Sequence, residues 1–149
     1  MSEFSSDGER IYKLWYAYAR KRDGAGLLSL YAPDATLESP VARAVMGGSS
    51  GVLHGRSQIL AFFQALAKQP TNELLRWYRE PDRFLFDGTI LMWEYPRLTP
   101  NGDQIDILEV MHLTGGLIQH QRVYWGWFGL QYLLQSMTPS HDNDSKVTG

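Results

Sequence analysis

The chain contains no cysteine among its 149 residues, and this absence excludes several kinds of chemistry at once. A chain without thiols forms no disulfide bonds, offers no cysteine nucleophile and provides no thiolate ligand for a metal. The four histidines show no spacing that is typical of a metal site. We therefore expect no metal and no cofactor.

Strong charge of either sign is also missing. The 14 basic and 16 acidic residues leave a net charge of -2, which gives no electrostatic footprint for nucleic acid. No apolar run reaches the length needed to cross a membrane, and the first residues, "MSEFSSDGER", lack the basic and apolar regions of a signal peptide. We therefore expect a cytoplasmic protein with no nucleic-acid partner and no membrane partner.

Hydrophobic residues, by contrast, are plentiful. They make up 44% of the chain, which is enough to form a hydrophobic core. The length of 149 residues suits one domain and is too short for two. We expect a single domain over residues 1–138, followed by a polar tail over residues 139–149. The composition of that tail is typical of a frayed terminus.

Apolar residues recur with helical spacing in three N-terminal segments. The sequence "SDGE" has the spacing of a capping box and predicts a helix over residues 7–22. The segment "DGAGLLSLYAP" predicts a short second helix that stops before Pro33, and "DATLESPV" then looks extended. Ser57 is the expected N-cap of a third helix. The glycine-rich residues 43–51 are expected to form a mobile lid at the mouth of a pocket.

Residues 72–127 read as strands divided by turns. The turn signals are "DG" at 87–88, "PNGD" at 100–103 and "GG" at 115–116, and they predict an antiparallel meander of four runs. The aromatic segment "RVYWGWFGL", residues 122–130, is expected to be the last strand. Helices followed by a long sheet indicate an α+β fold, in which three N-terminal helices cover the concave face of a curled antiparallel sheet and leave a cone-shaped pocket.

Three segments resemble a known family. They are "LYAPDATLESPV", "GVLHGRSQILAFFQAL" and "LTGGLIQHQRVYWGWFGLQYLL", and they are similar to the recurring segments of the nuclear transport factor 2-like superfamily, specifically its SnoaL-like polyketide cyclase branch. The resemblance spans roughly residues 9–134. It implies a cystatin-like α+β barrel and a pocket for a small molecule.

The ketosteroid isomerases of this superfamily supply a further comparison. The resemblance implies that their general base falls at Ser39 and their oxyanion-stabilising Asp at Met111, and neither side chain can do that work. Their helical tyrosine falls near Trp15, with Tyr16 next to it. Isomerase chemistry in its familiar form is therefore not expected, and Tyr16, Ser39 and Met111 become candidate ligand-binding residues.

Strand pairing predicts a different catalytic group. If the "PNGD" loop closes with Thr99 opposite Gln104, Glu94 lies opposite Glu109, and a two-residue "GG" turn places Arg122 on the other side of Glu109. Two carboxylates in an apolar pocket cannot both ionise cheaply, so we expect one pKa to rise above about 4.3 while Arg122 keeps the other group charged. Glu94, Glu109 and Arg122 are the predicted catalytic residues.

Two alternatives remain open for this row of Glu94, Glu109 and Arg122. Limonene epoxide hydrolase, another relative, has an Asp-Arg-Asp arrangement, to which the row corresponds in part. The row could instead face solvent or a dimer interface as an ordinary ion pair, because a slip of one residue in register reverses every assignment. The same register adds Met92, His120 and Tyr124 to the candidate ligand-binding residues.

Aromatic residues are also expected on the opposite, convex face of the sheet. Trp93, Tyr95, Trp125 and Trp127 exceed what a monomer normally exposes there, so the sequence predicts a homodimer through that face. Three classes of function remain open: an enzyme that works by acid–base chemistry on a small apolar molecule, a non-catalytic binder of such a molecule, and a protein-binding module.

Overall fold

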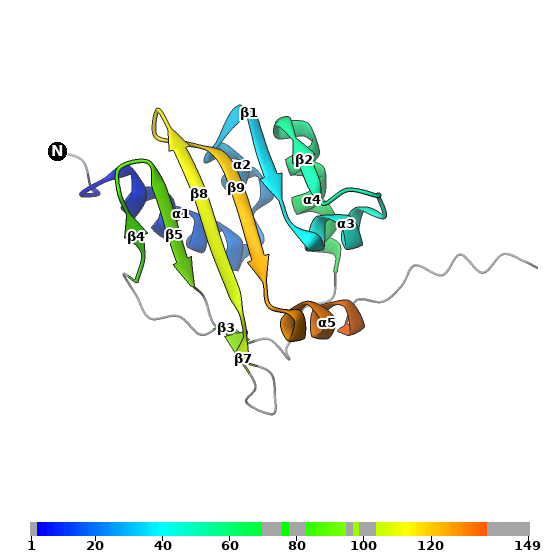
Figure 1. Cartoon of the computed structure of the whole chain (residues 1–149). Helices are drawn as coiled ribbons and strands as arrows, with labels where there is room; N and C mark the ends of the chain where they lie inside the picture. Colours follow the sequence, from blue (N-terminus) through cyan, green and yellow to red (C-terminus); the bar gives the residue numbers. More distant parts are fainter. Residues whose placement is uncertain (1–2, 70–75, 78–82, 95–96, 99–103, 137–149) are drawn as a thin grey trace, which may run out of the picture.

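The computed structural model describes residues 3–69, 76–77, 83–94, 97–98 and 104–136, and within them five helices and nine strands (Figure 1). The helices are α1 (Asp7–Lys21), α2 (Gly24–Ser29), α3 (Pro40–Met46), α4 (Gly55–Lys68) and α5 (Trp127–Ser136). The expected tail and the domain boundary at residue 138 lie outside the described residues.

The strands form two sheets. Six of them make the main sheet in the order β2-β1-β9-β8-β5-β4, and β3, β6 and β7 make a small second sheet. Their bounds are β1 (Tyr31–Glu38), β2 (Val52–His54), β3 (Arg76–Trp77), β4 (Leu85–Phe86), β5 (Ile90–Glu94), β6 (Arg97–Leu98), β7 (Gln104–Ile105), β8 (Ile107–Thr114) and β9 (Leu117–Trp125).

The α+β fold class is confirmed, with two changes of detail. The main sheet is curled but not closed, and β1 pairs with β9 in parallel, whereas every other pair in it is antiparallel. The turn signals along the chain could not show this pairing, because a parallel pair needs a long crossover rather than a hairpin. Tyr31 lies opposite Ile118, and Leu37 lies opposite Gln121.

Helices α1, α2 and α4 lie together on one side of the main sheet (Figure 1), and we call the face they cover the inner face. The core lies between these layers. The ring of Trp93 on β5 packs edge-on against Tyr12 of α1, with the ring centroids 5.3 Å apart, and lies 5.5 Å from Trp15. Each such buried side chain contributes about 1.5–3 kcal/mol of hydrophobic stabilisation.

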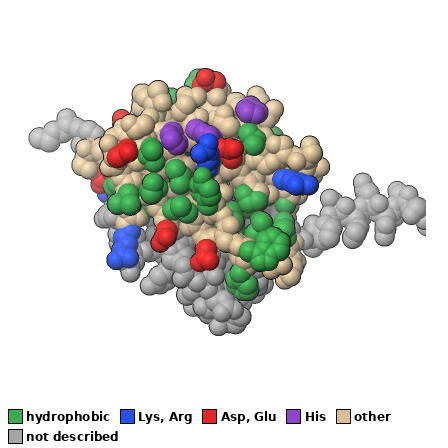
Figure 2. Space-filling model, viewed as in Figure 1, with side chains coloured by type: hydrophobic (Ala, Val, Ile, Leu, Met, Phe, Trp, Pro, Cys, Tyr) green, Lys and Arg blue, Asp and Glu red, His purple; other side chains and the backbone are tan. Residues whose placement is uncertain are grey.

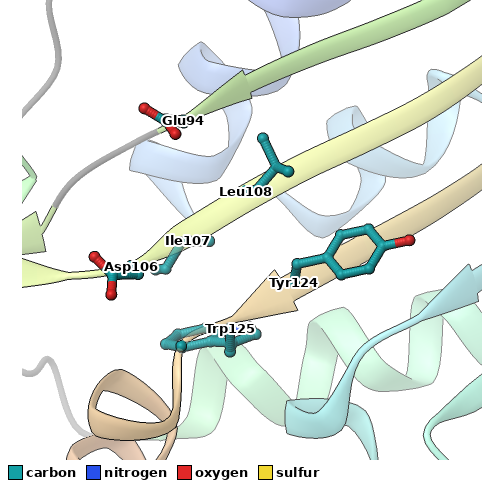
Figure 3. Close-up of a pocket in the computed structure, with 7 residues that line it drawn as sticks. Glu94, Asp106, Ile107, Leu108, Tyr124 and Trp125 are labelled. Atoms are coloured by element: carbon teal, nitrogen blue, oxygen red, sulfur yellow. The ribbon is translucent and has the colours of Figure 1, made fainter.

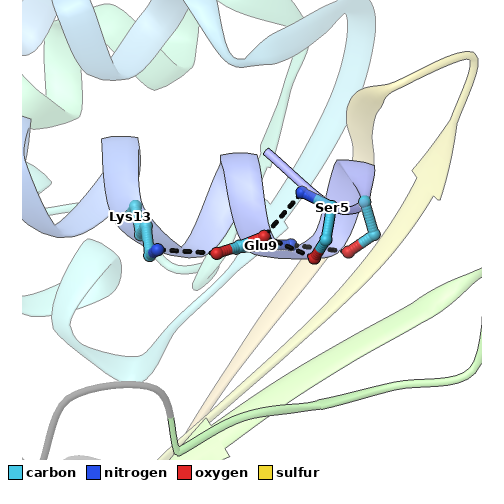
Figure 4. A network of polar contacts seen from close by, with 4 residues as sticks. Ser5, Glu9 and Lys13 are labelled. Atoms are coloured by element: carbon cyan, nitrogen blue, oxygen red, sulfur yellow. Dashed lines mark hydrogen bonds and ion pairs between the residues drawn. The ribbon is translucent and has the colours of Figure 1, made fainter. Parts of the chain in front are cut away.

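The start of α1 confirms the predicted cap. The Ser6 hydroxyl accepts a hydrogen bond from the Glu9 amide at 3.1 Å, and the Glu9 carboxylate accepts from Ser5 and from Lys13 (Figure 4). The hydrogen bonds from Lys13 and Ser5 lower the pKa of Glu9 to about 2. The charge also lies at the positive end of the helix dipole.

Several predicted element boundaries are wrong. Tyr31 begins β1 instead of ending the second helix, and α3 replaces the first half of the expected loop at residues 43–51. Helix α4 begins after His54, so Ser57 lies inside it and does not cap it. Helix α5 replaces the end of the expected last strand, since β9 ends at Trp125 and the helix begins at Trp127.

The register between β5 and β8 differs from the predicted one by one residue. Trp93, not Glu94, lies opposite Glu109, and Glu94 lies opposite Leu108. In the small second sheet, β6 and β7 continue the same register, with Leu98 opposite Gln104. The connection between these strands therefore has five residues instead of the predicted four.

The register between β8 and β9 is as predicted at the turn and changes beyond it. Thr114 lies opposite Leu117 across two glycines with positive φ angles, 58° and 75°. A β-bulge then adds Gln119 to β9, so that His112 lies opposite His120 and Glu109 lies opposite Val123. The predicted pairing of Glu109 with Arg122 is wrong.

Candidate functional site

Glu109 lies on the inner face of the sheet and is 1% exposed. It comes from β8, where every second residue from Ile107 to Leu113 is buried. Its carboxylate accepts a hydrogen bond from Nε2 of Gln121 on β9, at 2.7 Å. A buried charge requires such donors, because its transfer from water is costly.

The polar contacts continue from Gln121 towards the helices. Oε1 of Gln121 accepts from the hydroxyl of Tyr31, and the Tyr31 oxygen accepts from the indole N–H of Trp15 at 3.4 Å. Tyr31 is fully buried, and burial raises the pKa of its hydroxyl far above the ordinary value. We call Trp15, Tyr31, Gln121 and Glu109 the inner polar chain.

Four elements position the inner polar chain. Trp15 lies on the buried side of α1 with Ile11 and Tyr12, Tyr31 opens β1, and the other two residues belong to β9 and β8. Arg56 of α4 fixes the start of β1, because its guanidinium donates to the Tyr31 carbonyl. The inner polar chain therefore runs from α1, through the core, to the centre of the main sheet.

The outer face of the main sheet has no described helix over it. Glu38 accepts from Nε of Arg122 at 2.8 Å and is hydrogen-bonded to Nε2 of His120, whose ring stacks on that of His112 with centroids 5.9 Å apart. Arg122 and then His120 hold the pKa of Glu38 below its ordinary value. Glu38 in turn raises the pKa of Arg122.

A shallow pocket of about 220 Å³ lies at the rim where β5, β8 and β9 end (Figure 3). It is lined by Glu94, Asp106, Ile107, Leu108, Tyr124, Trp125 and Gly126. We call it the rim pocket. Ile107 and Trp125 lie opposite each other on the inner face. They are two residues along their strands from Glu109 and Val123, which form the neighbouring pair on the same face. The rim pocket thus adjoins the inner polar chain.

The predicted catalytic row does not form. Glu109 is on the inner face, whereas Glu94 and Arg122 are exposed and belong to the outer set of alternating positions. The two carboxylates are therefore on opposite faces, and the shared proton that we expected for them has no structural basis. The cause is the one-residue register slip on one side of β8 and the bulge on the other.

The predicted ligand-binding residues are also divided between the faces. Met111 is fully buried on the inner face, whereas Met92, His120 and Tyr124 are on the outer face. Tyr16 lies on α1, where its hydroxyl is 3.5 Å from the guanidinium of Arg20. The structure therefore places Met111 with Glu109 and separates the others from it.

Ser39, another predicted ligand-binding residue, is the N-cap of α3. Its hydroxyl accepts from the Val41 amide at 3.2 Å, and Pro40 takes the first helical position. The side chain is 6% exposed. This contact gives Ser39 a structural role.

The sequence reasoning missed Tyr31, Gln121 and Asp106. Tyr31 was assigned to a helix, and Gln121 shares a face with Met111 once the bulge at Gln119 is known. Asp106 follows the short strand β7, and its carbonyl accepts from the Gly126 amide at 2.9 Å. Gln121 stands in a run of four polar residues, Gln119 to Arg122, so its residue type gave no signal that it is the buried one.

Two negative findings apply to the part of the chain that the structure describes. In that part, no three His, Asp or Glu side chains are placed to hold a metal ion. None of the helices seen there is long and apolar enough to cross a membrane.

A curled open sheet, helices over its inner face and a short polar chain buried in the hydrophobic core between them define an α+β protein. A model of the SnoaL-like domain matches residues 12–121, and the chain belongs to this family. It is therefore a member of the nuclear transport factor 2-like superfamily, which confirms the resemblance read from the sequence.

Solved structures support this assignment at the level of the fold. An NTF2-like protein of unknown function from Burkholderia pseudomallei has a TM-score of 0.66 at 18% identity and covers 89% of this chain and 98% of its own. TerC, co-crystallised with polyporic acid, has a TM-score of 0.65 at 20% identity over 87% of this chain and 99% of its own.

A third structure is a protein from Kribbella flavida assigned as a ketosteroid isomerase. It has a TM-score of 0.58 at 18% identity, covering 80% of this chain and 78% of its own. No curated protein sequence matches the chain.

Proposed function

We propose that the protein binds a small, largely apolar molecule on the inner face of the sheet and acts on it by acid–base chemistry through Glu109. The observation that carries the proposal is a carboxylate 1% exposed on a face built from apolar and aromatic side chains, with one oxygen fixed by Gln121 at 2.7 Å. A carboxylate held in this way is poised to accept a proton or a hydrogen bond.

Two of the similar structures support a ligand-binding role. TerC was co-crystallised with a small organic molecule, and the Kribbella flavida protein is assigned to an isomerase activity. Both share the fold with this chain, and the fold alone does not select the reaction. The residues of this site must therefore carry the chemical argument.

The chemistry open to Glu109 is proton transfer without a cofactor. Its carboxylate would take a proton from a carbon next to a carbonyl, and the resulting acid would return that proton to another position of the same molecule. Tyr31 donates to Gln121 and Gln121 donates to Glu109, so these two residues hold the carboxylate in place and do not themselves react.

Access to Glu109 requires movement of side chains. Ile107 and Trp125 lie between it and the rim pocket, and Glu109 is nearly inaccessible to water. A ligand entering through the rim pocket would displace these two side chains. Ile107→Ala should then speed binding, because the smaller side chain leaves room beside Glu109.

A β,γ-unsaturated ketosteroid tests binding and turnover with one probe. Binding should quench the fluorescence of the inner-face tryptophans, and isomerisation should produce the ultraviolet absorption of the conjugated enone. Glu109→Gln should bind the steroid and lose turnover, because the amide keeps the shape and cannot take up the proton. Glu38→Gln, on the outer face, is the matched control and should behave as the wild type.

Each alternative has its own result in this experiment. Quenching without turnover, equal in the wild type and Glu109→Gln, would indicate a non-catalytic binding protein. Absence of both signals in the wild type would contradict the proposal for this class of ligand and favour a protein-binding module.

A further inference from the structure

The rim pocket changes in character from one strand to the next. Its carboxylates come from Glu94 at the end of β5 and from Asp106 just before β8, whereas the rings of Tyr124 and Trp125 come from the end of β9 (Figure 3). Among the described residues that line it, two are acidic and none is basic. The pocket therefore presents negative charge beside an aromatic surface.

The register of the main sheet sets the spacing of these groups. Glu94 lies opposite Leu108, and Leu108 lies opposite Tyr124, so the three form one row on the outer face. Neighbouring strands are about 4.8 Å apart, which puts the backbone of Glu94 roughly 10 Å from that of Tyr124. A molecule with an ammonium group on a short alkyl chain and one aromatic ring matches this row.

The backbone holds Asp106 at the same end of the sheet. Its carbonyl accepts from the Gly126 amide at 2.9 Å. Its side chain also lies against Gly126, where an added Cβ atom would come within 2.9 Å of it. Glycine at position 126 thus allows the Asp106 carboxylate to lie next to the end of β9, close to the aromatic side of the pocket.

Glu94 and Tyr124 are accessible to a ligand. Glu94 is exposed and forms no ion pair or hydrogen bond with the part of the chain that the structure describes. Tyr124 is 50% exposed. Arg122 lies two residues from Tyr124 on the same face, but its charge is paired with Glu38 at 2.8 Å. The negative charge of Glu94 is therefore available to a cation from solution.

Trp125 supplies an independent observation that points to a ligand. Its indole N–H is buried and has no hydrogen-bond partner in the described ranges of the chain. Buried polar groups are nearly always paired, so an unpaired donor on a side chain that lines a pocket indicates a place where a bound molecule changes the packing. We therefore expect a ligand of this pocket to alter the surroundings of the Trp125 ring.

We propose that the rim pocket binds arylalkylamines, with the ammonium group beside the carboxylates of Glu94 and Asp106 and the aromatic ring against Tyr124 and Trp125. An ammonium group gains from the carboxylates and from the faces of the rings. A ligand carboxylate would instead meet like charges. The proposal goes beyond the proposed function, because it needs neither Glu109 nor proton transfer.

Calorimetry with three indoles of similar shape tests the ligand class. Tryptamine carries an ammonium group, N-acetyltryptamine is neutral, and indole-3-propionate carries a carboxylate. At low salt the wild type should bind tryptamine at least about fivefold more tightly than N-acetyltryptamine, and indole-3-propionate most weakly. Added salt should reduce the preference for tryptamine, because exposed charges are screened.

Two variants separate the charge from the aromatic surface. Glu94→Gln should weaken tryptamine binding about fivefold and leave N-acetyltryptamine unchanged, because the amide keeps the shape and loses the charge. Tyr124→Leu should weaken both indoles by a similar factor. Asp34→Asn is the matched control, since it removes one exposed charge beside Gln119, near the other end of β9, and should change neither affinity.

Nitrogen-15 NMR locates the bound amine. The indole N–H signal of Trp125, identified by its absence in Trp125→Phe, should shift when tryptamine is added. The signal of Trp15 should stay in place, because that N–H is already bonded to Tyr31 in the core.

Equal wild-type affinity for tryptamine and indole-3-propionate would overturn the inference. An equal loss of tryptamine binding in Glu94→Gln and Asp34→Asn would also overturn it, because the effect would then belong to the net charge of the chain. Tryptamine binding that shifts Trp15 and not Trp125 would place the amine elsewhere and overturn it as well. None of these results bears on turnover of the steroid, so the two proposals can fail separately.

Discussion

Tyr31 is the residue on which two buried groups depend. Its hydroxyl donates to Gln121 and accepts from Trp15, and its side chain is fully buried. Removal of one partner from a buried hydrogen bond costs the desolvation of the group that remains. The stability of the folded chain should therefore be sensitive to one oxygen atom.

We expect Tyr31→Phe to lower the free energy of unfolding by about 1–3 kcal/mol. Tyr18→Phe, with a half-buried ring and an unchanged shape, should change it by less than about 0.5 kcal/mol. Urea unfolding followed by tryptophan fluorescence measures both. Equal losses in the two variants would show that the hydroxyl contributes nothing specific.

On the outer face, the ion pair of Glu38 with Arg122 makes a stability contribution that depends on pH. Arg122 and His120 lower its pKa in the folded chain below the ordinary 4.5, so folding favours its ionised form. The resulting stabilisation is present above the unfolded pKa and is lost as pH falls through the lower, folded pKa. The side chain is 35% exposed, so solvent screening keeps the contribution below about 1 kcal/mol.

We therefore expect Glu38→Gln to be slightly less stable than the wild type at pH about 7, and equal to it in strong acid. Added salt should reduce the difference at neutral pH, because exposed ion pairs are screened. Thermal unfolding at a series of pH values and salt concentrations checks both statements. A difference that grows on acidification would have the wrong sign for this ion pair.

At the scale of the element, Ser39 and Ser57 differ in whether they cap a helix. The sequence indicated Ser57 as a cap, yet α4 begins at Gly55 and its N-cap is His54. The amide of His54 is bonded to Oε1 of Gln58 at 2.9 Å. Ser39, by contrast, caps α3 through its own hydroxyl.

We expect Ser39→Ala to destabilise the protein by about 1 kcal/mol, the usual loss for an N-cap. Ser57→Ala should have an effect near zero, because alanine is the better residue inside a helix. Chemical denaturation of the two variants gives the comparison. A larger loss for Ser57→Ala would contradict the cap assignment.

At the scale of the whole molecule, the outer face of the main sheet is not covered by any described helix. Its centre is apolar, with Met92, Leu108, Val110 and Tyr124 at alternating positions of three adjacent strands. Figure 2 shows a group of hydrophobic side chains on this side of the molecule, between histidine and basic side chains and a pair of acidic ones. Of the aromatic residues expected there, Trp93 and Trp125 lie on the inner face and Trp127 belongs to α5, while Tyr95 lies outside the described residues.

We expect a homodimer through this outer face, with the copies related by a two-fold axis. Such an axis would bring the basic end of one copy, near Arg122, towards the acidic end of the other, near Glu94 and Asp106. Sedimentation equilibrium at micromolar concentration should give twice the chain mass of 17.0 kDa. Val110→Arg should give the single chain mass, and a wild-type monomer would contradict the prediction.

Several elements could be predicted from local sequence, because their signals are local, whereas α3 and α5 were not predicted. The Ser-x-x-Glu spacing predicted the start of α1, and "GG" predicted the turn between β8 and β9, since a type I′ turn needs two residues with positive φ. The failures are also local in origin. Ser57 offered a cap that the chain does not use, and Tyr31 continued an apolar pattern that fits either a helix or a strand.

What the amino-acid sequence determined by itself is the family, the α+β class and three of the helices, α1, α2 and α4. Only the tertiary structure decided the register, and with it the face on which each polar side chain lies. Strand side chains alternate with a period of two, so one extra loop residue and the bulge at Gln119 moved Glu94 and Arg122 away from Glu109. The inner polar chain joins residues 15, 31, 121 and 109, and contacts so distant in the sequence form only when the layers pack.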